Sequence, residues 1–446
     1  LMERPLRVAL ICHFSNPEVR EKLPLSGCKI ENYIRKILNK RNKQLFDYAP
    51  WVTNLIYEFE KRNDIEIHII SPHKNLKKFK YSFSYNNIHY HFFRPDDDIL
   101  IIKIYRRFFN VKRPKYYHNR YLINQFLKDI KPDIVNLVGA ENPYYSIAGL
   151  DISNLPLILT AQTVYTNPLR EKHSGDVDRY RWDLELRIHK KIKYFCCNGL
   201  MHRNLVLRNN PEAMIFHFTF PFKHPQIIDN IAKKYDFVFF AAGVTKKKGV
   251  EDTIQALKLV KKEFPEVTLN IVGKCAADYR KFLDKMIEEL QLKDNIEFTN
   301  YFIKQSDMHK HIQQAKYAVL PVKLDVISST IIEAMILGFP VITYKTTGTP
   351  FLNKYGEAVL ISEIDDVNSL AKNMLRVVKE PELVDRMLAN SKVFIEREYD
   401  NKANMDKFVS IYNAVYKHYY NREPIPKELL FNPDEFPEYK KVNYYD

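Results

Sequence analysis

The chain has 446 residues, more than one hydrophobic core usually supports, and this length predicts two domains of about 200 residues each. A hydrophobic content of 46% excludes a largely disordered protein, and a net charge of +15 favours partners that carry phosphate or anionic lipid. Nucleic acid is disfavoured as that partner, because the sequence has no zinc-finger spacing, aromatic RNA-binding signature or basic leucine heptad.

The five cysteines are odd in number and lack Cys-x-x-Cys spacing, which favours a reducing compartment. The sequence shows no apolar stretch typical of a signal peptide before its first expected strand, and no uninterrupted apolar run of about 18 residues. We therefore expect a cytoplasmic protein without a transmembrane helix.

In the first half, short apolar runs alternate irregularly with helical stretches such as Trp51 to Lys61, a pattern typical of parallel strands covered by helices. Pro24 to Cys28, which contains Gly27, follows the first expected strand and is either a ligand-contacting loop or an ordinary surface loop. The expected buried strands are Arg7 to Cys12, Ile65 to Ser71, Ile134 to Val138 and Leu157 to Ala161.

A basic segment lies within this half. From Lys103 to Arg120 there are seven basic residues and no acidic one, interleaved with aromatic side chains such as Phe108 and Phe109. Such a segment can lie on a membrane, with its cations at anionic headgroups and its aromatic rings in the interface. The alternative is a solvated basic face whose aromatic rings pack in the core.

The second half alternates more regularly and predicts a Rossmann-like domain. Two prolines and several polar residues between Pro221 and Asp229 mark the boundary, so we expect domains at residues 1–225 and 226–400. The expected strands are Phe237 to Ala241, Val267 to Val272, Ile296 to Phe298, Tyr317 to Leu320, Val341 to Tyr344 and Ala358 to Ile361. The expected helices are Gly249 to Phe264, Ala276 to Leu290, Met308 to Gln314, Thr330 to Leu337 and Val367 to Lys379.

Residues 401–446 form the end of the chain. They contain a helical stretch, Met405 to Tyr419, followed from Arg422 by a tail without periodicity. We expect this helix and tail to pack back on the N-terminal domain. No G-x-G-x-x-G follows any expected strand, which argues against a dinucleotide-dependent enzyme.

Two segments of the second half carry candidate chemistry. In the first, a strand ends near Gly243 and is followed by three lysines, Lys246 to Lys248, and a helix. Helix amides and lysine charge would both favour an anion such as phosphate. The alternative is a solvated turn whose lysines face water.

The second segment places Ser328, Ser329 and Thr330 at the start of another helix, after a strand and a polar loop. Their hydroxyls and amides would meet a diphosphate, and Glu333 one turn further on could accept hydrogen bonds from ribose hydroxyls. Thr330-x-x-Glu333 also fits a capping box, in which the glutamate only reaches back to the Thr330 backbone. Spacing alone does not decide between the two.

Together these segments resemble the donor domain of GT-B glycosyltransferases, specifically the retaining family-4 kind also called glycosyl transferases group 1. The resemblance covers roughly Asp236 to Tyr419 and rests on motifs in the family's order. These are Lys248-Gly249, Val272-Gly273, Asn295 to Asn300, Ala315 to Pro321, Glu333-Ala334-Met335 with Gly338-x-Pro340-Val341, and Gly348-x-Pro350. The resemblance implies an α/β protein of the GT-B fold, with two Rossmann-like domains facing across a cleft.

The resemblance also implies roles for individual residues. Lys248 matches the lysine that neutralises the donor phosphate, and Glu333 matches the glutamate that holds the ribose. Ser329 and Thr330 match the diphosphate-binding turn. Asp325 stands eight positions before Glu333, where the family usually has a glutamate near the transferred sugar, so we expect Lys248 and Asp325 to be catalytic.

Several residues depart from the family pattern. Gly243, in the donor-binding segment, stands where many members carry an arginine that clamps the donor phosphates, and Ser328 replaces a glycine. Phe351 replaces an acidic residue, and Gln162 replaces a histidine that touches the donor sugar. Gly27 is the remaining glycine of a loop that is usually glycine-rich in the family.

The function implied is a retaining transferase that moves a sugar from a nucleotide-diphosphate sugar to a glycan or lipid-linked acceptor in cell-surface polysaccharide biosynthesis. UDP-sugar is favoured over GDP-sugar as the donor substrate, and neither a cofactor nor a metal ion is expected. Asp96 to Asp98 invites comparison with the metal-binding motif of the other major glycosyltransferase fold, but a solvated acidic turn is the better interpretation. The alternative function is a catalytically impaired protein that binds a nucleotide or glycan and assists an active enzyme.

Overall fold

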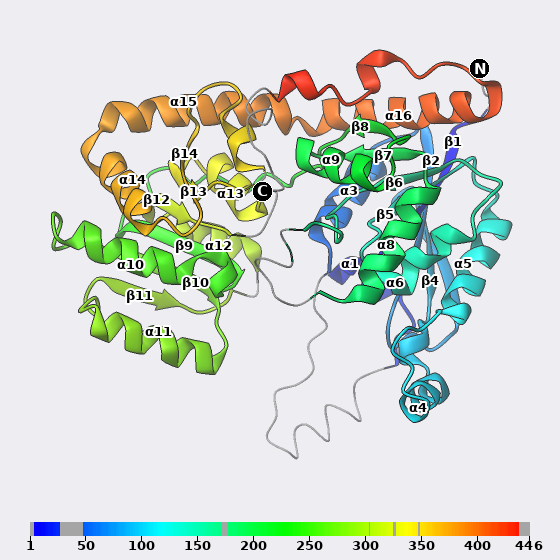
Figure 1. Cartoon of the computed structure of the whole chain (residues 1–446), viewed down its shortest axis with the longest axis horizontal. Helices are drawn as coiled ribbons and strands as arrows, with labels where there is room; N and C mark the ends of the chain where they lie inside the picture. The colour runs from blue at the N-terminus through cyan, green and yellow to red at the C-terminus, as the bar shows by residue number, and fades with distance from the viewer. Residues whose placement is uncertain are drawn as a thin grey trace. The chain divides into compact units, whose positions relative to one another are not determined.

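The computed structural model describes residues 4–26, 48–168, 170, 177–302, 304–323, 327–346 and 348–436 (Figure 1). The chain divides into two units. Unit 1 runs to Phe222 and also takes in Asn401–Asn432. Unit 2 runs from Lys223 to Asp400 and includes the described residues after Asn432. No helix in the described ranges is both long and apolar enough to cross a membrane.

Unit 1 is built on an eight-stranded sheet with the order β3-β4-β2-β1-β5-β6-β7-β8. All neighbouring strands run parallel except β3, which pairs antiparallel with β4 at one edge. The strands are β1 (Leu6–Ile11), β2 (Ile65–Pro72), β3 (Lys80–Tyr85), β4 (Ile88–Phe93), β5 (Ile134–Val138), β6 (Leu157–Thr160), β7 (Tyr194–Cys197) and β8 (Met214–His217).

Helices cover the sheet of unit 1. One core cluster joins apolar residues of β1, β2 and β4 to residues of α3 and α16, so the helix at residues 401–421 packs on this unit. Within it the ring of Phe408 stacks on Phe218, and Asn136 donates a hydrogen bond to the Tyr412 hydroxyl. The helices are α1 (Pro17–Lys22), α3 (Pro50–Glu60), α4 (Leu100–Phe108), α5 (Tyr117–Ile130), α6 (Pro143–Ser146), α8 (Arg179–Lys191), α9 (Leu200–Asn209) and α16 (Asn401–Asn421), with 3-10 turns at Asp96–Asp98, Ile147–Leu150 and Lys427–Leu429.

Unit 2 has a six-stranded, fully parallel sheet with the order β11-β10-β9-β12-β13-β14. From β9 the chain adds β10 and β11 toward one edge of the sheet, and from β12 it adds β13 and β14 toward the other edge. The strand order therefore reverses between the neighbours β9 and β12. Ligands of such sheets bind outside the carboxyl ends of the strands at this reversal. The strands are β9 (Tyr235–Gly243), β10 (Leu269–Lys274), β11 (Ile296–Thr299), β12 (Ala315–Leu320), β13 (Val341–Tyr344) and β14 (Val359–Ser362).

Amphipathic helices flank the sheet of unit 2, and residues of α10, α11, α14 and α15 join its strands in one core cluster. The helices are α10 (Val250–Lys261), α11 (Ala277–Glu289), α12 (Gln305–Ile312), α13 (Ser329–Ile336), α14 (Val367–Lys379) and α15 (Pro381–Glu398), with 3-10 turns at Lys246–Lys248, Thr349–Asn353 and Pro433–Glu435. The expected strands of both units are present, with ends that differ by two residues or fewer.

Candidate active site

Two turns meet at the strand reversal of unit 2. The turn after β9 carries Lys246 to Lys248 and passes through Gly249, whose φ of 82° is left-handed, into α10. A Cβ atom at Gly249 would lie 2.1 Å from the carbonyl oxygen of Pro321, just after β12. The backbone amide of Lys323 also donates to the carbonyl of Lys247 at 3.0 Å. The basic turn is therefore held by backbone contacts against the turn that follows β12.

Charge in this region is partly balanced within the protein. Lys323 is nearly buried, and its Nζ lies 2.8 Å from Oδ1 of Asp252 and 2.7 Å from Oδ1 of Asp365. Burial lowers the pKa of Lys323, but the two carboxylates outweigh it and the net shift is upward. Asp252 and Glu251 stand in the first turn of α10, so the start of this helix already holds negative charge. Among the three lysines of the turn, Lys246 and Lys247 are exposed and Lys248 is half-buried.

The start of α13 differs from the start of α10 in its charge. Ser328 is the N-cap in extended conformation, it is buried, and its Oγ lies 3.0 Å from Oγ1 of Thr330. Ser329 is exposed and Thr330 is half-buried. No acidic residue stands in the first turn of α13. Its positive end is therefore better suited to an anion than the start of α10.

The capping-box interpretation of Glu333 is wrong. Because the helix begins at Ser329, Thr330 is the second helical residue and not the cap, and Glu333 lies beyond the position that reaches back. The Glu333 carboxylate is buried and is instead held by α12, with Nε2 of Gln305 at 3.0 Å and Nε2 of His309 at 3.1 Å. Each carboxylate oxygen keeps a further lone pair for a ligand hydroxyl.

Gly243 is the last residue of β9 and is half-buried. A Cβ atom built there would meet nothing closer than the Cγ2 atom of Thr245 at 4.0 Å. Packing therefore does not force a glycine at this position, because an added Cβ atom has room. Asp325 and Gly27, the other two residues predicted to contact ligands, lie outside the described residues.

Phe351 follows the Gly348-x-Pro350 turn and is buried. Its ring stacks on Phe436 with centroids 4.6 Å apart and meets Phe394 edge to face. The residue that replaces the family's acidic side chain therefore belongs to an aromatic cluster of unit 2.

Unit 1 has a corresponding reversal between β1 and β5, where sequence reasoning singled out Gln162 but not His13, Glu141 or Tyr144. His13 follows β1 and Glu141 follows β5, while Tyr144 places its hydroxyl 2.6 Å from Nδ1 of His13. Gln162 reaches the same edge and donates to the carbonyl of Val138 at 3.0 Å. The sequence did hold a signal for Glu141, because this charged residue stands shortly after the predicted buried strand that ends at Val138.

Glu141 is the most unusual of these groups. Burial raises the pKa of its carboxyl group to about 7, and burial together with the nearby His73 and Lys74 lowers the pKa of His13 to about 4. Oε1 of Glu141 accepts a hydrogen bond from Asn142, whereas Oε2 is buried without a partner among the described residues. A buried, unsatisfied acidic oxygen at a strand reversal is suited to bind a ligand hydroxyl.

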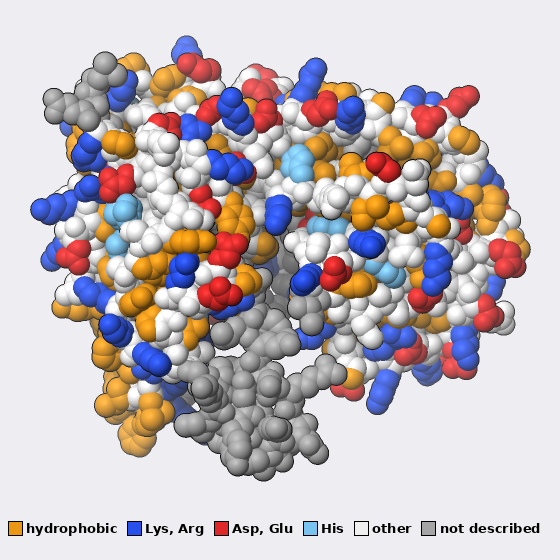
Figure 2. Space-filling model, turned by 180° about the vertical axis from the view of Figure 1, so that it is seen from behind, with side chains coloured by type: hydrophobic (Ala, Val, Ile, Leu, Met, Phe, Trp, Pro, Cys, Tyr) orange, Lys and Arg blue, Asp and Glu red, His pale blue; other side chains and the backbone are white. Residues whose placement is uncertain are grey.

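The basic segment from Lys103 to Arg120 begins within α4, which buries none of its residues. Leu100, Ile101 and Phe108 are exposed by 70%, 75% and 81%. Figure 2 shows hydrophobic side chains gathered where this helix projects from unit 1, at the lower left of the view. The alternative that placed the aromatic rings of this segment in the core is therefore wrong for α4.

The acidic turn before α4 is more ordered than a solvated turn. Asp96 is buried and pairs with Arg106 at 2.6 Å. Asp98 pairs with Arg94 at 3.0 Å, and Asp97 pairs with Lys74 at 2.6 Å. Each carboxylate thus has a basic partner within unit 1.

The chain resembles known glycosyltransferases in sequence. Residues 225–394 match the family model for glycosyl transferases group 1. The chain is 27% identical over 176 residues to a trehalose synthase of Pyrococcus horikoshii, an alignment that covers 38% of this chain and 41% of the relative. It is 23% identical to the capsular polysaccharide biosynthesis glycosyltransferase CapM of Staphylococcus aureus, covering 81% of this chain and 93% of the relative. The chain thus spans less than half of the first relative.

Solved structures resemble most of the chain. Sucrose-phosphate synthase from Thermosynechococcus elongatus matches with a TM-score of 0.65 and 14% identity, covering 92% of this chain and 99% of that one. Anabaena HepE in complex with UDP matches with a TM-score of 0.62 and 12% identity, covering 92% and 99%. The expected α/β class and GT-B fold are therefore confirmed, and so is the resemblance to group 1 over residues 225–394.

Proposed function

We propose that this chain is a glycosyltransferase that moves a sugar from a nucleotide-diphosphate sugar to a glycan or lipid-linked acceptor, with retention of anomeric configuration. UDP-sugar is the favoured donor, with GDP-sugar as the alternative, and cell-surface polysaccharide synthesis is the favoured process. The observation that carries the proposal is the meeting of a basic turn and an uncompensated helix start at the strand reversal of unit 2. The relatives that act on sugars and the UDP bound to HepE support it.

In this proposal the diphosphate lies between Lys248 and the start of α13. As the bond to the sugar breaks, negative charge grows on the departing diphosphate, and the ammonium group together with the Ser329 and Thr330 amides stabilises it. Glu333 accepts hydrogen bonds from ribose hydroxyls. Asp325 keeps its proposed place near the transferred sugar by resemblance alone.

The proposed donor site needs no metal ion, because lysine and helix amides supply the positive charge that a metal ion would otherwise provide. Transfer measured in the presence of EDTA should equal transfer without it. A loss of transfer that added magnesium or manganese restores would contradict this part of the proposal.

We further propose that Glu141 receives the acceptor hydroxyl in unit 1. Its Oε2 atom is buried and unsatisfied, and its pKa of about 7 lets the carboxyl group exchange a proton near neutral pH. Among the described residues, Gln162 and Tyr144 stand at the same sheet edge and offer further polar groups.

The test is calorimetric binding of UDP- and GDP-sugars to the parent, to Glu333→Ala and to Glu289→Ala, followed by transfer or hydrolysis of the donor that binds. Glu289 is an exposed glutamate of α11 and serves as the matched control. We expect the parent and Glu289→Ala to bind one nucleotide class, and Glu333→Ala to bind it at least tenfold more weakly. Equal binding by all three proteins would contradict the ribose role.

The alternative function is a catalytically impaired protein that binds nucleotide or glycan as a partner of an active enzyme. Gly243 and Gln162, which replace two groups that usually contact the donor, favour it. Tight nucleotide binding without transfer or hydrolysis would support this alternative, whereas turnover of any donor would eliminate it.

We also propose that α4 docks unit 1 on the inner face of an anionic membrane. Its exposed apolar residues would enter the interface while Lys103 and Arg107 meet lipid phosphates. Sedimentation with vesicles that contain phosphatidylglycerol should fall at least fivefold for Phe108→Glu. Phe282→Glu, which changes an exposed phenylalanine of α11, should sediment like the parent, and equal sedimentation of both variants would contradict the proposal.

A further inference from the structure

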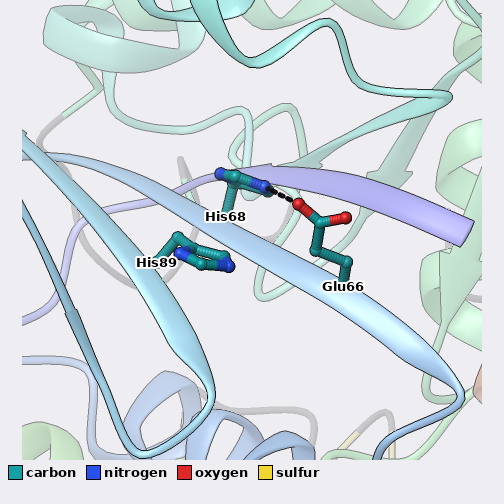
Figure 3. A group of neighbouring side chains, drawn as sticks. All are labelled: Glu66, His68 and His89. Atoms are coloured by element: carbon teal, nitrogen blue, oxygen red, sulfur yellow. Dashed lines mark hydrogen bonds and ion pairs between the residues drawn. The ribbon is translucent and has the colours of Figure 1, made fainter. Parts of the chain in front are cut away.

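Glu66, His68 and His89 share one face of the unit 1 sheet, and their ligand atoms all lie within 4.8 Å of one another (Figure 3). Glu66 and His68 stand two residues apart on β2, and His89 is the register partner of His68 on β4. Alternation along strands therefore points all three side chains the same way. The rings of His68 and His89 stack with centroids 4.6 Å apart.

Hydrogen bonds orient these imidazoles in the manner of metal ligands. Nδ1 of His68 lies 3.0 Å from Nε2 of His91, and Nδ1 of His89 lies 2.7 Å from Oγ of Ser84. A metal-binding histidine typically donates its other ring N–H to a neighbour, which fixes the tautomer and the ring. Nε2 of His68 and Nε2 of His89 are thereby the nitrogens left for an ion. The two rings are only 21° from parallel, so they must turn toward one another to share it.

The carboxylate is also positioned. Nε2 of His68 lies 2.8 Å from Oε1 of Glu66. Two ligand atoms of one tetrahedral zinc ion lie roughly 3.3 Å apart, so these two side chains must move slightly apart to admit the metal. Nε of Arg7 donates to the same Oε1 atom at 2.8 Å and anchors the carboxylate from outside. Among the described residues Oε2 has no hydrogen-bond partner, which leaves it for the ion.

We propose that Glu66, His68 and His89 bind a Zn²⁺ ion, with water as the fourth ligand. Two imidazoles and one carboxylate form a donor set that suits zinc, whereas magnesium and calcium require oxygen ligands. The site lies within β2 and β4, away from the strand ends that carry His13 and Glu141. The ion therefore ties β4 to β2 and stabilises unit 1, and this role is independent of the proposed transferase activity.

The experiment uses the untagged full-length chain, stripped with EDTA and dialysed. Titration with zinc chloride should show one tight site, and cobalt chloride should give the visible absorption of tetrahedral cobalt. His89→Ala and Glu66→Gln should each weaken zinc binding at least tenfold and remove the cobalt band. His224→Ala, which changes an exposed histidine of unit 2, should bind like the parent.

Ser84→Ala provides a milder variant if His89→Ala does not fold. It removes only the partner of His89 Nδ1 and should weaken zinc binding roughly tenfold. Zinc should also raise the unfolding temperature of the parent and leave that of Glu66→Gln unchanged. Absence of tight zinc binding by the parent, or parent-like binding by Glu66→Gln, would overturn the proposal and leave a histidine cluster that only stabilises the sheet.

Discussion

Nε2 of His309 lies 3.1 Å from Oε2 of Glu333, so the carboxylate predicted to hold ribose is oriented by a neighbouring helix. Gln305, from the same helix α12, holds the other oxygen at 3.0 Å. A buried carboxylate with two fixed partners has one orientation, and its remaining lone pairs point in set directions. This contact makes His309 a positioning residue for the proposed donor site.

Replacing His309 with alanine should weaken nucleotide binding about 3- to 10-fold, because Glu333 loses one of its two restraints. Calorimetry on the parent, both single variants and the double variant measures the coupling. In the Glu333→Ala background His309→Ala should have no further effect, since the group it positions is gone. Additive losses would show that His309 acts on the nucleotide by another route.

Gly243→Arg should tighten nucleotide binding by roughly tenfold or more, because a guanidinium adds a charge-assisted contact to phosphate worth about 1.5 to 3 kcal/mol. The backbone position accepts a Cβ atom, because the nearest atom to an added Cβ lies 4.0 Å away. Gly243→Gln, whose side chain is polar and shorter than arginine but uncharged, is the control. If both variants bind equally well, the phosphates do not lie beside the end of β9.

Gly249→Ala should destabilise the protein far more than Gly338→Ala. Both glycines have positive φ, 82° and 75°, so each alanine costs about 1 kcal/mol in backbone strain. Only at Gly249 does the added methyl group meet backbone, the Pro321 carbonyl at 2.1 Å, whereas Gly338 has nothing within 4 Å. Chemical denaturation should show an extra loss of about 2 kcal/mol or more at Gly249. Equal losses would mean that the turn at Gly249 does not contact the turn that follows β12.

Much of unit 2 was predictable from the sequence because most of its strands, although not the edge strand β11, are largely buried and read as continuous apolar runs. The hairpin of β3 and β4 was missed, although Asn86 and Asn87 both have positive φ between two alternating segments, a combination typical of a tight turn. The short strands β7 and β8 were missed as well. Equally short strands such as β13 were found because they are rich in β-branched residues, whereas β7 has none and β8 has one, Ile215.

The candidate site was only partly predictable. The order of motifs located Lys248 and Glu333. Sequence spacing did not show whether the Glu333 carboxylate belongs to a capping box or is available to a ligand. That distinction depends on where α13 begins and on partners in α12, 24 and 28 residues earlier in the chain. Glu141 was missed for a similar reason, because its burial depends on tertiary packing around a strand end.

Glu141→Gln should make stability less sensitive to pH. The pKa of Glu141 is raised by burial from an ordinary value of 4.5 to about 7, so between these values the folded protein keeps a proton that the unfolded chain has lost. Stability from this group is therefore full below about pH 4.5 and falls as pH rises through 7, by up to about 3 kcal/mol.

Glutamine stays neutral, so Glu141→Gln should be more stable relative to the parent at about pH 8 than at about pH 5. Thermal unfolding of both proteins at the two pH values measures this difference. Glu212→Gln, which changes an exposed glutamate of unit 1, should show no such difference. If Glu141→Gln and the parent respond equally to pH, the carboxyl group is ionised in the folded protein at neutral pH, and its place as the receiver of an acceptor hydroxyl loses its main support.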